Sequence, residues 1–508
     1  MIAIRIDREA DQPLYAQIRD ALMAAIRNGR LGPGERLPTV AAFATGLGVT
    51  QGTVRRAYED LIKSGKVFSQ VGRGTFVLAP EPAGSQEPLA PAPPPSAPSV
   101  DPEVRLAAQR LRTDIARSLE GLFVLQDRPG VIRFTSGFPA PDSIRPGLLE
   151  EMTGRALADV PEVHQSTLEP AGLPSFREEL ARYFRSWGLS VTPDHILVTS
   201  GSQQALALIA QAAGPEDRIL YETPCYTGVP GAFEAFDRYA ESVPRDPDGP
   251  ELGRLGRFSD ERPGLFYICP ELHNPMGLDL APDRTITLAA WGREHRMVFV
   301  TDMIFHDLRF EGVAPPMLAL EAGLDHSIMV GSFSKSFLAS LRVGWLVSTP
   351  ERVRGLASLK KAMDQGTATL PQAVVLSALR SGAYDDHLAS VRKRYRQRRD
   401  VMIEALGNNM PEGVEWTTPP GGFNMWVRLP PGYSSVALYF LAVEQGVSFI
   451  PGPYMDRDHR FINAFRISYS QVEPDQIREG VRRLAASVHE LVKGPPSEPG
   501  LSGLGDFL

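Results

Sequence analysis

Two kinds of hydrophobic periodicity divide the chain. Between residues 14 and 62, apolar residues recur every three or four positions, which predicts amphipathic helices. Past residue 130, short runs rich in β-branched and aromatic residues alternate with helical segments; the runs are HILVTS, RILYE, LFYIC, RMVFVTD and SIMVGS. This alternation predicts an α/β domain with a parallel sheet, whose functional side chains gather where the strands end. We therefore expect two domains of different architecture.

The first pattern predicts a winged helix-turn-helix. The segment LYAQIRDALMAAIRNG places apolar residues four positions apart, and LPTVAAFATGLG follows with Thr39 as its N-cap. After a three-residue turn, TQGTVRRAYEDLIKSG begins a second helix at Thr50. A short helix, a tight turn and a second helix form the helix-turn-helix pattern. The next segment, KVFSQVGRGTFVL, alternates around a VGRG turn and predicts a hairpin, or wing.

The second of these helices carries side chains suited to DNA on its exposed face. Polar and basic groups near its N-terminus could reach base edges and phosphates in a major groove; they are Thr50, Gln51, Thr53, Arg55 and Arg56. The hairpin tip offers Arg73 to a phosphate. On the pattern alone, a basic exposed face is more often simply solvated.

Residues 12–78 resemble the GntR-type winged helix-turn-helix. The resemblance rests on PLYAQIRDALMAAI, GRLGPGERLPT, LGVTQGTVRRAYEDL and GRGTFV, in that order and spacing. It implies that this domain binds double-stranded operator DNA. The family usually has an arginine that contacts DNA just after LP(S/T), whereas VAA stands here at residues 40–42. We therefore expect DNA binding to depend more on Arg36, Arg55, Arg56 and Arg73.

Composition separates the two domains further. Residues 1–78 carry 11 basic and seven acidic residues, a net charge of +4, while the whole chain of 508 residues has a net charge of −7. Between the domains, residues 79–100 contain eight prolines and no aromatic or basic residue, which predicts a semi-rigid linker, although its PAPPP run also has the spacing of an SH3-type ligand. We predict a DNA-binding domain at 1–78, a linker at 79–105, an α/β domain at 106–490 and a flexible tail at 491–508.

The chain has few signals of export, membrane insertion or metal binding. Its N-terminus reaches a charged residue, Asp7, before a secretory apolar segment could form, and no stretch approaches the length of a membrane span. Cys225 and Cys269 are the two cysteines, and they lie 44 positions apart without a CxxC motif. We therefore expect a cytoplasmic protein with no membrane partner, no metal site and no disulfide.

The strand ends of the second domain carry a distinctive set of groups. In chain order these are Ser200-Gly201-Ser202-Gln203, Tyr226, Asn274, Asp302 and Ser332-Phe333-Ser334-Lys335. A phosphate cradle, an aromatic ring, an amide, a carboxylate and a lysine match the parts of pyridoxal 5'-phosphate one by one. Taken singly, each group has an ordinary structural explanation, such as a surface lysine or a helix cap. Together and in this order they predict a site for that cofactor.

Each group has an expected role. Lys335 would form the Schiff base, Asp302 would pair with the pyridinium nitrogen, and Asn274 would donate to the ring oxygen. Tyr226 would lie on the ring face. The phosphate would be bound by Ser202, Gln203, Ser332, Ser334 and Arg342.

Residues 130–490 resemble the fold-type I pyridoxal phosphate aminotransferases. The motifs are EPAGLPSFREELARYF, VTSGSQQAL, HNPMG, the Asp302 segment, GSFSKSFLASLRVGW, GGFNMW and FRISYS. The resemblance implies an α/β fold: a large, mostly parallel sheet with helices on both faces and a smaller α+β subdomain. It also implies a homodimer with the site near the subunit interface, and Arg466 as the group that binds a substrate or effector carboxylate, beside Asn274 and Gly137. The family commonly has a tyrosine at the position of Phe305, so we expect cofactor binding to survive, while fast transamination stays open.

The two domains in this order resemble the MocR subfamily of GntR-type regulators. That resemblance implies a transcription regulator in which an amino-compound effector forms an external aldimine and thereby changes DNA binding. Two alternatives stay open at this point. One is a working aminotransferase whose DNA-binding domain is secondary; the other is a cofactor-free domain that only dimerises the chain.

Overall fold

The computed structural model describes most of the chain in two units. The described residues are 6–7, 12–28, 30–31, 35–63, 67–70, 74–77, 126, 129–164, 169–258 and 262–496. The chain divides by its contacts into residues 1–101 and residues 102–508. The predicted linker, residues 79–105, lies outside the described residues.

The first unit is a winged helix-turn-helix, as predicted. Its elements are α1 (Leu14–Arg27), α2 (Val40–Leu47), α3 (Gln51–Lys63), β1 (Val67–Gln70) and β2 (Gly74–Val77). The side chain of Thr39 accepts a hydrogen bond from the Ala42 amide and caps α2, and Gly48 ends that helix with a φ of 64°. Of the apolar positions spaced four apart, Ile18 and Leu22 are fully buried in the core of this unit, while Leu14 and Ile26 are half-buried.

The second unit is built on a large sheet that is mostly parallel. In the described residues, eight strands lie in the order β4-β11-β10-β9-β8-β5-β6-β7. Strand β11 runs antiparallel to both of its neighbours and β7 runs antiparallel to β6, while the other pairs of neighbours are parallel. The strands are β4 (Ile196–Thr199), β5 (Arg218–Thr223), β6 (Glu241–Asp246), β7 (Gly249–Pro250), β8 (Gly264–Ile268), β9 (Met297–Asp302), β10 (Ser327–Ser332) and β11 (Gly344–Val347).

Helices cover both faces of this sheet because alternate strand residues point to opposite sides. Leu197 packs into one hydrophobic core with α7, α8 and α13, whereas its neighbours Ile196 and Val198 pack into another with α5, α6 and α14. Helices α10 and α11 cover the far half of that second face. Their bounds are α5 (Leu148–Asp159), α6 (Pro174–Arg185), α7 (Ser202–Ala212), α8 (Gly228–Glu234), α10 (Pro282–Glu294), α11 (Leu318–Ala322), α13 (Pro350–Asp364) and α14 (Thr369–Arg380).

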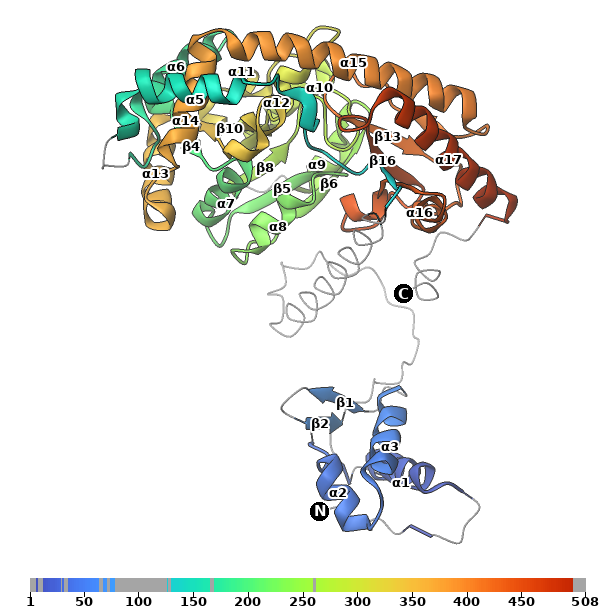
Figure 1. Ribbon diagram of the computed structural model, residues 1–508. Helices are drawn as coiled ribbons and strands as arrows, with labels where there is room; N and C mark the ends of the chain where they lie inside the picture. The colour runs from blue at the N-terminus through green and yellow to red at the C-terminus, as the bar shows by residue number, and fades with distance from the viewer. Residues whose placement is uncertain are drawn as a thin grey trace. The chain divides into compact units, whose positions relative to one another are not determined.

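A smaller α+β subdomain follows the large sheet. Strands β12 (Glu415–Trp416), β13 (Asn424–Arg428), β16 (Ala464–Ser468) and β15 (Ile450–Pro451) form an antiparallel sheet in that order. Helices α16 (Ser435–Glu444) and α17 (Pro474–Lys493) complete it, and the long α15 (Ala383–Asn409) leads to it from the large sheet (Figure 1). The predicted boundary at residue 490 falls inside α17, which continues because Leu491 and Val492 pack against the core.

Short elements join these layers. Strand β3 (Ile132–Arg133) pairs in parallel with β14 (Val447–Ser448), so the segment that enters the second unit is bound to the small subdomain. The described residues also contain the short helices α9 (Leu252–Leu255) and α12 (Phe333–Ser336). The 3-10 turns are Pro141–Ser143, Pro161–His164, Pro193–His195, Gly256–Phe258, His306–Leu308, Leu324–His326, Ala339–Leu341 and Gly452–Met455. Within the described ranges, no helix is both long and apolar enough to cross a membrane.

Candidate functional site

The first unit presents an exposed polar face at the start of α3. Gln51, Arg55 and Arg56 are exposed, while Thr53 is half-buried. The hydroxyl of Thr50 accepts a hydrogen bond from the Thr53 amide at 3.3 Å, which caps the helix as predicted. Free amides and two arginines at a helix N-terminus suit contact with phosphates.

The wing is broader than the predicted hairpin. Residues 35–37 pair with β2, because the Leu37 amide donates to the Thr75 carbonyl at 2.7 Å and the Val77 amide donates to the Glu35 carbonyl at 3.0 Å. This pairing places the exposed Arg36 beside the wing. Arg73, predicted at the hairpin tip, lies outside the described residues.

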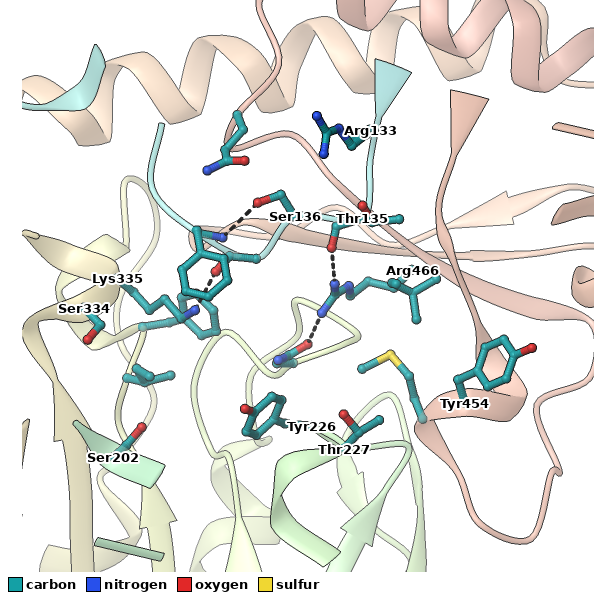
Figure 2. Close-up of a pocket in the computed structure, with 18 of the residues that line it drawn as sticks. Arg133, Thr135, Ser136, Ser202, Tyr226, Thr227, Ser334, Lys335, Tyr454 and Arg466 are labelled. Carbon is teal, nitrogen blue, oxygen red and sulfur yellow. Dashed lines mark hydrogen bonds between the residues drawn. The ribbon is translucent and has the colours of Figure 1, made fainter. Parts of the chain in front are cut away.

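One large pocket gathers the candidate residues of the second unit. Its volume is about 1170 Å³, and it lies where the strands of the large sheet end. Figure 2 shows Lys335, Ser334 and Ser202 on one side and Arg466 with Tyr454 on the other. All eleven residues that the sequence nominated for the cofactor and effector line this pocket: Gly137, Ser202, Gln203, Tyr226, Asn274, Asp302, Ser332, Ser334, Lys335, Arg342 and Arg466.

Lys335 lies on α12, and its half-buried amine lines the pocket. The hydroxyl of Ser332 accepts a hydrogen bond from the Ser334 amide and caps this short helix. The Lys335 Nζ donates to the Gly137 carbonyl at 2.7 Å and lies 4.0 Å from the centre of the Phe138 ring. Burial, together with the positive charges of Arg466 and Arg342, lowers the pKa of Lys335 to about 8. About a tenth of this amine is therefore uncharged and nucleophilic at pH 7, far more than for an ordinary lysine.

Asp302 is the buried carboxylate at the end of β9. Its Oδ2 accepts a hydrogen bond from the Tyr267 hydroxyl at 2.7 Å, and its Oδ1 accepts one from the Ile304 amide at 3.0 Å. Burial raises the pKa of Asp302 to about 6, although both hydrogen bonds and the charge of Lys335 oppose that rise. Near pH 7 the carboxylate is ionised and can pair with a cationic ring nitrogen.

A concave anion site lies at the start of α7. Arg342 donates from Nη1 to the Ser334 hydroxyl and from Nη2 to the Ser200 carbonyl, both at 3.3 Å. Gly201 has a φ of 80°, and a Cβ there would lie 2.7 Å from the Arg342 Nη2, so only glycine leaves room for this approach. Among the described residues, no carboxylate forms an ion pair with Arg342. The helix N-terminus, hydroxyls and guanidinium together match a phosphate dianion.

Arg466 is a buried guanidinium without a counter-ion. Its Nη1 donates to Asn274 Oδ1 at 3.1 Å, and its Nη2 donates to the Thr135 carbonyl at 2.6 Å. Its Nε has no partner among the described residues, nor does any carboxylate there form an ion pair with it. Burial lowers the pKa of Arg466 to about 10. A buried cation of this kind is completed by a carboxylate ligand.

Aromatic and amide groups complete the pocket. The Tyr226 side chain is exposed at 41%, so its ring is available to a ligand. Asn274 already accepts a hydrogen bond through its oxygen, which leaves its amide nitrogen to donate. Phe305 lies at the predicted position, buried and 5.4 Å from the ring of Phe423, with no hydroxyl to offer. In the described part of the chain, no cluster of three or more histidine, cysteine, aspartate or glutamate residues could hold a metal.

Comparison with known proteins identifies both units. A profile of the family described as "Aminotransferase class I and II" matches residues 131–484. The chain belongs to the aminotransferase class I and II family. Residues 14–77 match the family described as "Bacterial regulatory proteins, gntR family". The GntR-type and aminotransferase resemblances noted in the sequence are thereby confirmed.

Relatives of this aminotransferase class I and II chain are of two kinds. The 2-aminoadipate transaminase of Thermus thermophilus is 33% identical over 74% of this chain and 95% of that protein. The probable rhizopine catabolism regulatory protein MocR of Rhizobium meliloti is 27% identical over 95% of each chain, so it spans both units. Among solved structures, α-aminoadipate aminotransferase from Thermus thermophilus, complexed with N-(5'-phosphopyridoxyl)-L-leucine, has a TM-score of 0.66 and 31% identity over 72% of this chain and 94% of that one.

The pocket fits the cofactor of this aminotransferase family. Pyridoxal phosphate is the cofactor that the fold and the phosphopyridoxyl-bound structure support. Around one cavity of this chain lie a half-buried amine of lowered pKa, a buried ionised carboxylate and a cationic cradle that has no counter-ion among the described residues. Removing each of these groups from water costs free energy, which a ligand of complementary charge in the cavity would offset.

Several pocket residues were not anticipated from the sequence. Tyr267, which donates to Asp302, lies inside β8, one residue before that strand ends, whereas the sequence nominated residues at or after the strand ends. Thr135 and Phe138 belong to the segment that follows β3. Both residues line the pocket, and the Thr135 carbonyl accepts a hydrogen bond from Arg466. The period-two pattern of LFYIC could have nominated Tyr267, since Tyr267 and Cys269 point to the same side of β8 and both line the pocket.

Proposed function

We propose that this pyridoxal phosphate-dependent, DNA-binding transcription regulator senses an amino acid. Residues 1–78 bind operator DNA and residues 79–105 connect the domains. The domain predicted at 106–490, which α17 continues to Lys493, binds cofactor and effector, and the residues after it form the tail. The observation that carries the proposal is the buried, unpaired Arg466 in a pocket that also holds the reactive Lys335, within a chain that has a GntR-type domain. The protein acts in the cytoplasm.

The cofactor would be held by the residues of the pocket. When bound, pyridoxal phosphate supplies an aldehyde that condenses with amines and a ring that withdraws electrons. Lys335 would hold the aldehyde, Asp302 would pair with the ring nitrogen, Asn274 would donate to the ring oxygen, and Tyr226 would lie on the ring face. The phosphate is assigned to Ser202, Gln203, Ser332, Ser334 and Arg342.

An effector with an amine and a carboxylate would suit the other side of the pocket. The Arg466 guanidinium binds the carboxylate, and Asn274 and the backbone of Gly137 lie beside it, because Arg466 donates to Asn274 and Lys335 donates to Gly137. Binding there would favour one arrangement of the subdomains over another, which changes DNA affinity as a population shift.

DNA contact is assigned to the exposed face of the first unit and its wing. The proposed contacts are Arg36, Thr50, Gln51, Thr53, Arg55, Arg56 and Arg73. A homodimer built by the larger domain would present two such units, and the linked pair binds DNA more tightly than one unit alone because the second contact is intramolecular.

The experiment that tests this function couples two measurements on the full-length protein. Amino compounds are screened for changes in the absorbance of the bound cofactor, and DNA selected from a random duplex library is then titrated with and without each active compound. We expect an amino acid that changes both signals. A compound that changes the cofactor spectrum without changing DNA affinity, for every DNA selected, would reject the sensing role.

A second candidate function is amino transfer to a 2-oxo acid. The sequence similarity to a transaminase, which covers 95% of that protein, favours this activity. The presence of all the candidate cofactor residues in one pocket also favours it. Phe305 opposes it, because the hydroxyl that the family commonly places there is missing. Steady turnover of an amino acid with a 2-oxo acid would support this activity, and we expect Phe305→Tyr to raise it.

A further inference from the structure

The carboxylate of Asp302 has a phenol partner that the cofactor roles do not use. Tyr267 stands on β8 and Asp302 on the adjacent parallel strand β9, two strands whose register places Tyr267 beside Val300. The Tyr267 hydroxyl donates to Asp302 Oδ2 at 2.7 Å. Both side chains are buried and both line the pocket.

The contact leaves Asp302 free to bind one more donor. Each carboxylate oxygen can accept two hydrogen bonds, and the protein supplies one to each: the Tyr267 hydroxyl to Oδ2 and the Ile304 amide to Oδ1. Two fixed donors prevent rotation of the carboxylate about its terminal torsion. The remaining lone pairs are therefore held toward the pocket instead of being averaged over orientations.

The charged and titratable groups around Asp302 have opposite effects on its pKa. Burial and the carboxylate of Glu222 raise the pKa of Asp302, while Tyr267, the Ile304 amide and Lys335 lower it. Cys269 directly follows β8, the strand of Tyr267, and burial raises the pKa of its thiol well above the ordinary value. Burial also raises the pKa of Tyr267, so its hydroxyl keeps its proton and remains a donor.

We propose that Tyr267 is a positioning residue for the cofactor: its hydroxyl keeps the Asp302 carboxylate ionised and oriented, so that Asp302 can hold a proton on the ring nitrogen. The inference rests on the proposed placement of pyridoxal phosphate against Asp302. It goes further because Tyr267, which would not touch the cofactor itself, would help to keep the ring in its electron-withdrawing, protonated state. Phe305 offers no hydroxyl to the ring oxygen, so the protonation of the ring depends more on the groups near the ring nitrogen.

The test compares two cofactors on the full-length protein after cofactor removal. One is pyridoxal phosphate and the other is its carbocyclic analogue, in which C–H replaces the ring nitrogen while aldehyde and phosphate are kept. We expect the unaltered protein to bind pyridoxal phosphate more tightly, and Tyr267→Phe to reduce this preference by about tenfold, the effect of losing one hydrogen bond to a charged group. In ¹⁵N NMR, the labelled ring nitrogen should move toward the neutral-pyridine shift in Tyr267→Phe.

Matched variants separate this role from general packing. Tyr469→Phe removes another buried phenol, which donates to the Gly421 carbonyl outside the pocket, and should leave both measurements unchanged. Tyr267→Met, also lacking a hydroxyl, replaces the phenylalanine variant if that one does not fold. Equal affinity of the unaltered protein for the two cofactors would refute the placement against Asp302. A preference and a nitrogen shift that survive in Tyr267→Phe would refute the role of Tyr267 alone.

Discussion

The two units of the chain carry their functional cations in opposite environments. In the first unit, Arg36, Arg55 and Arg56 are exposed. In the second, Arg466 is buried and Lys335 is half-buried, and removal from water lowers the pKa of both. Exposed cations are screened by salt and suit a long polyanion, whose counterions they release. Buried cations suit one small anion of defined shape, because only that ligand offsets their desolvation.

The same contrast exists within the second unit. Three other buried arginines have carboxylate partners: Arg245 pairs with Glu222, Arg398 with Glu473 and Arg399 with Glu311. Arg466 instead donates to an amide oxygen and a backbone carbonyl, which offset its charge less completely. A missing counter-ion, more than burial itself, therefore distinguishes an arginine that awaits a ligand from one that stabilises the fold.

The largest expected effect is that of Lys335→Ala. Without the Nζ, no covalent link to the cofactor can form, so borohydride reduction followed by peptide mass analysis should find no modified peptide. The fold should persist, since Lys335 donates to a single carbonyl, that of Gly137. Reduced cofactor attached to a different lysine would contradict the assignment.

The rate at which cofactor links to the cofactor-free protein should depend strongly on pH. Only the neutral amine reacts, and the pKa of Lys335 is about 8, so the rate should fall about tenfold for each pH unit below 8 and level off above it. An ordinary lysine would show this midpoint near 10.5. Arg466→Gln removes one of the positive charges that lower the pKa, and should move the midpoint upward. Stopped-flow absorbance across pH 6 to about 10 measures both curves.

Loss of Arg466 should weaken the effector and spare the cofactor. Arg466→Ala removes charge-assisted hydrogen bonds worth about 1.5–3 kcal/mol, which corresponds to a loss of about ten- to a hundredfold in effector affinity. Arg399→Ala is the matched control, because that arginine pairs with Glu311 away from the pocket; it should lower the melting temperature without changing effector affinity. Identical titrations of unaltered protein and Arg466→Ala would make Arg466 structural.

Local features of the fold were predictable from the sequence because their signals are local. The caps at Thr39 and Thr50, the strands at HILVTS, RILYE and SIMVGS, and the position of candidate groups at strand ends all follow from short-range patterns. The expectation of a mostly parallel sheet with a smaller subdomain is also confirmed. The alternation of strands and helices predicted the parallel sheet, because buried parallel strands are continuously apolar. The smaller subdomain was implied by the family resemblance.

Contacts between distant segments were not predictable in the same way. Arg466 meets Asn274 across 192 positions, and Tyr267 meets Asp302 because β8 and β9 are neighbours, an order that hydrophobic patterns do not specify. The antiparallel β11 was not anticipated either, since it follows the Lys335 motif without a turn signal of its own. The chemical role of a single residue was therefore easier to predict than the contacts that fix its orientation or shift its pKa.

Within the first unit, Arg55 should contribute to DNA binding through phosphate contact. Arg55→Ala should lower the slope of log affinity against log salt by about one for each copy of the domain that touches DNA. Arg19→Ala is the control, because Arg19 lies on α1 and forms an ion pair with Asp20 at 2.8 Å. Fluorescence anisotropy over a salt series measures the slopes, and an unchanged slope for Arg55→Ala would move the phosphate contact elsewhere on the unit.

The smallest expected effect distinguishes Arg56 from its neighbour. The Arg56 guanidinium lies 4.3 Å above the Tyr15 ring, so part of its role is to join α3 to α1. An exposed cation–π contact of this kind contributes about 0.5–1 kcal/mol. Arg56→Ala should therefore reduce hydrogen-exchange protection of α3 amides in the full-length chain, and change the salt slope less than Arg55→Ala does. Tyr15→Leu should cause the same loss of protection, and the double variant should add little, because both changes remove one contact. If Arg56→Ala instead leaves protection intact and lowers the slope as much as Arg55→Ala, both arginines belong to the DNA surface.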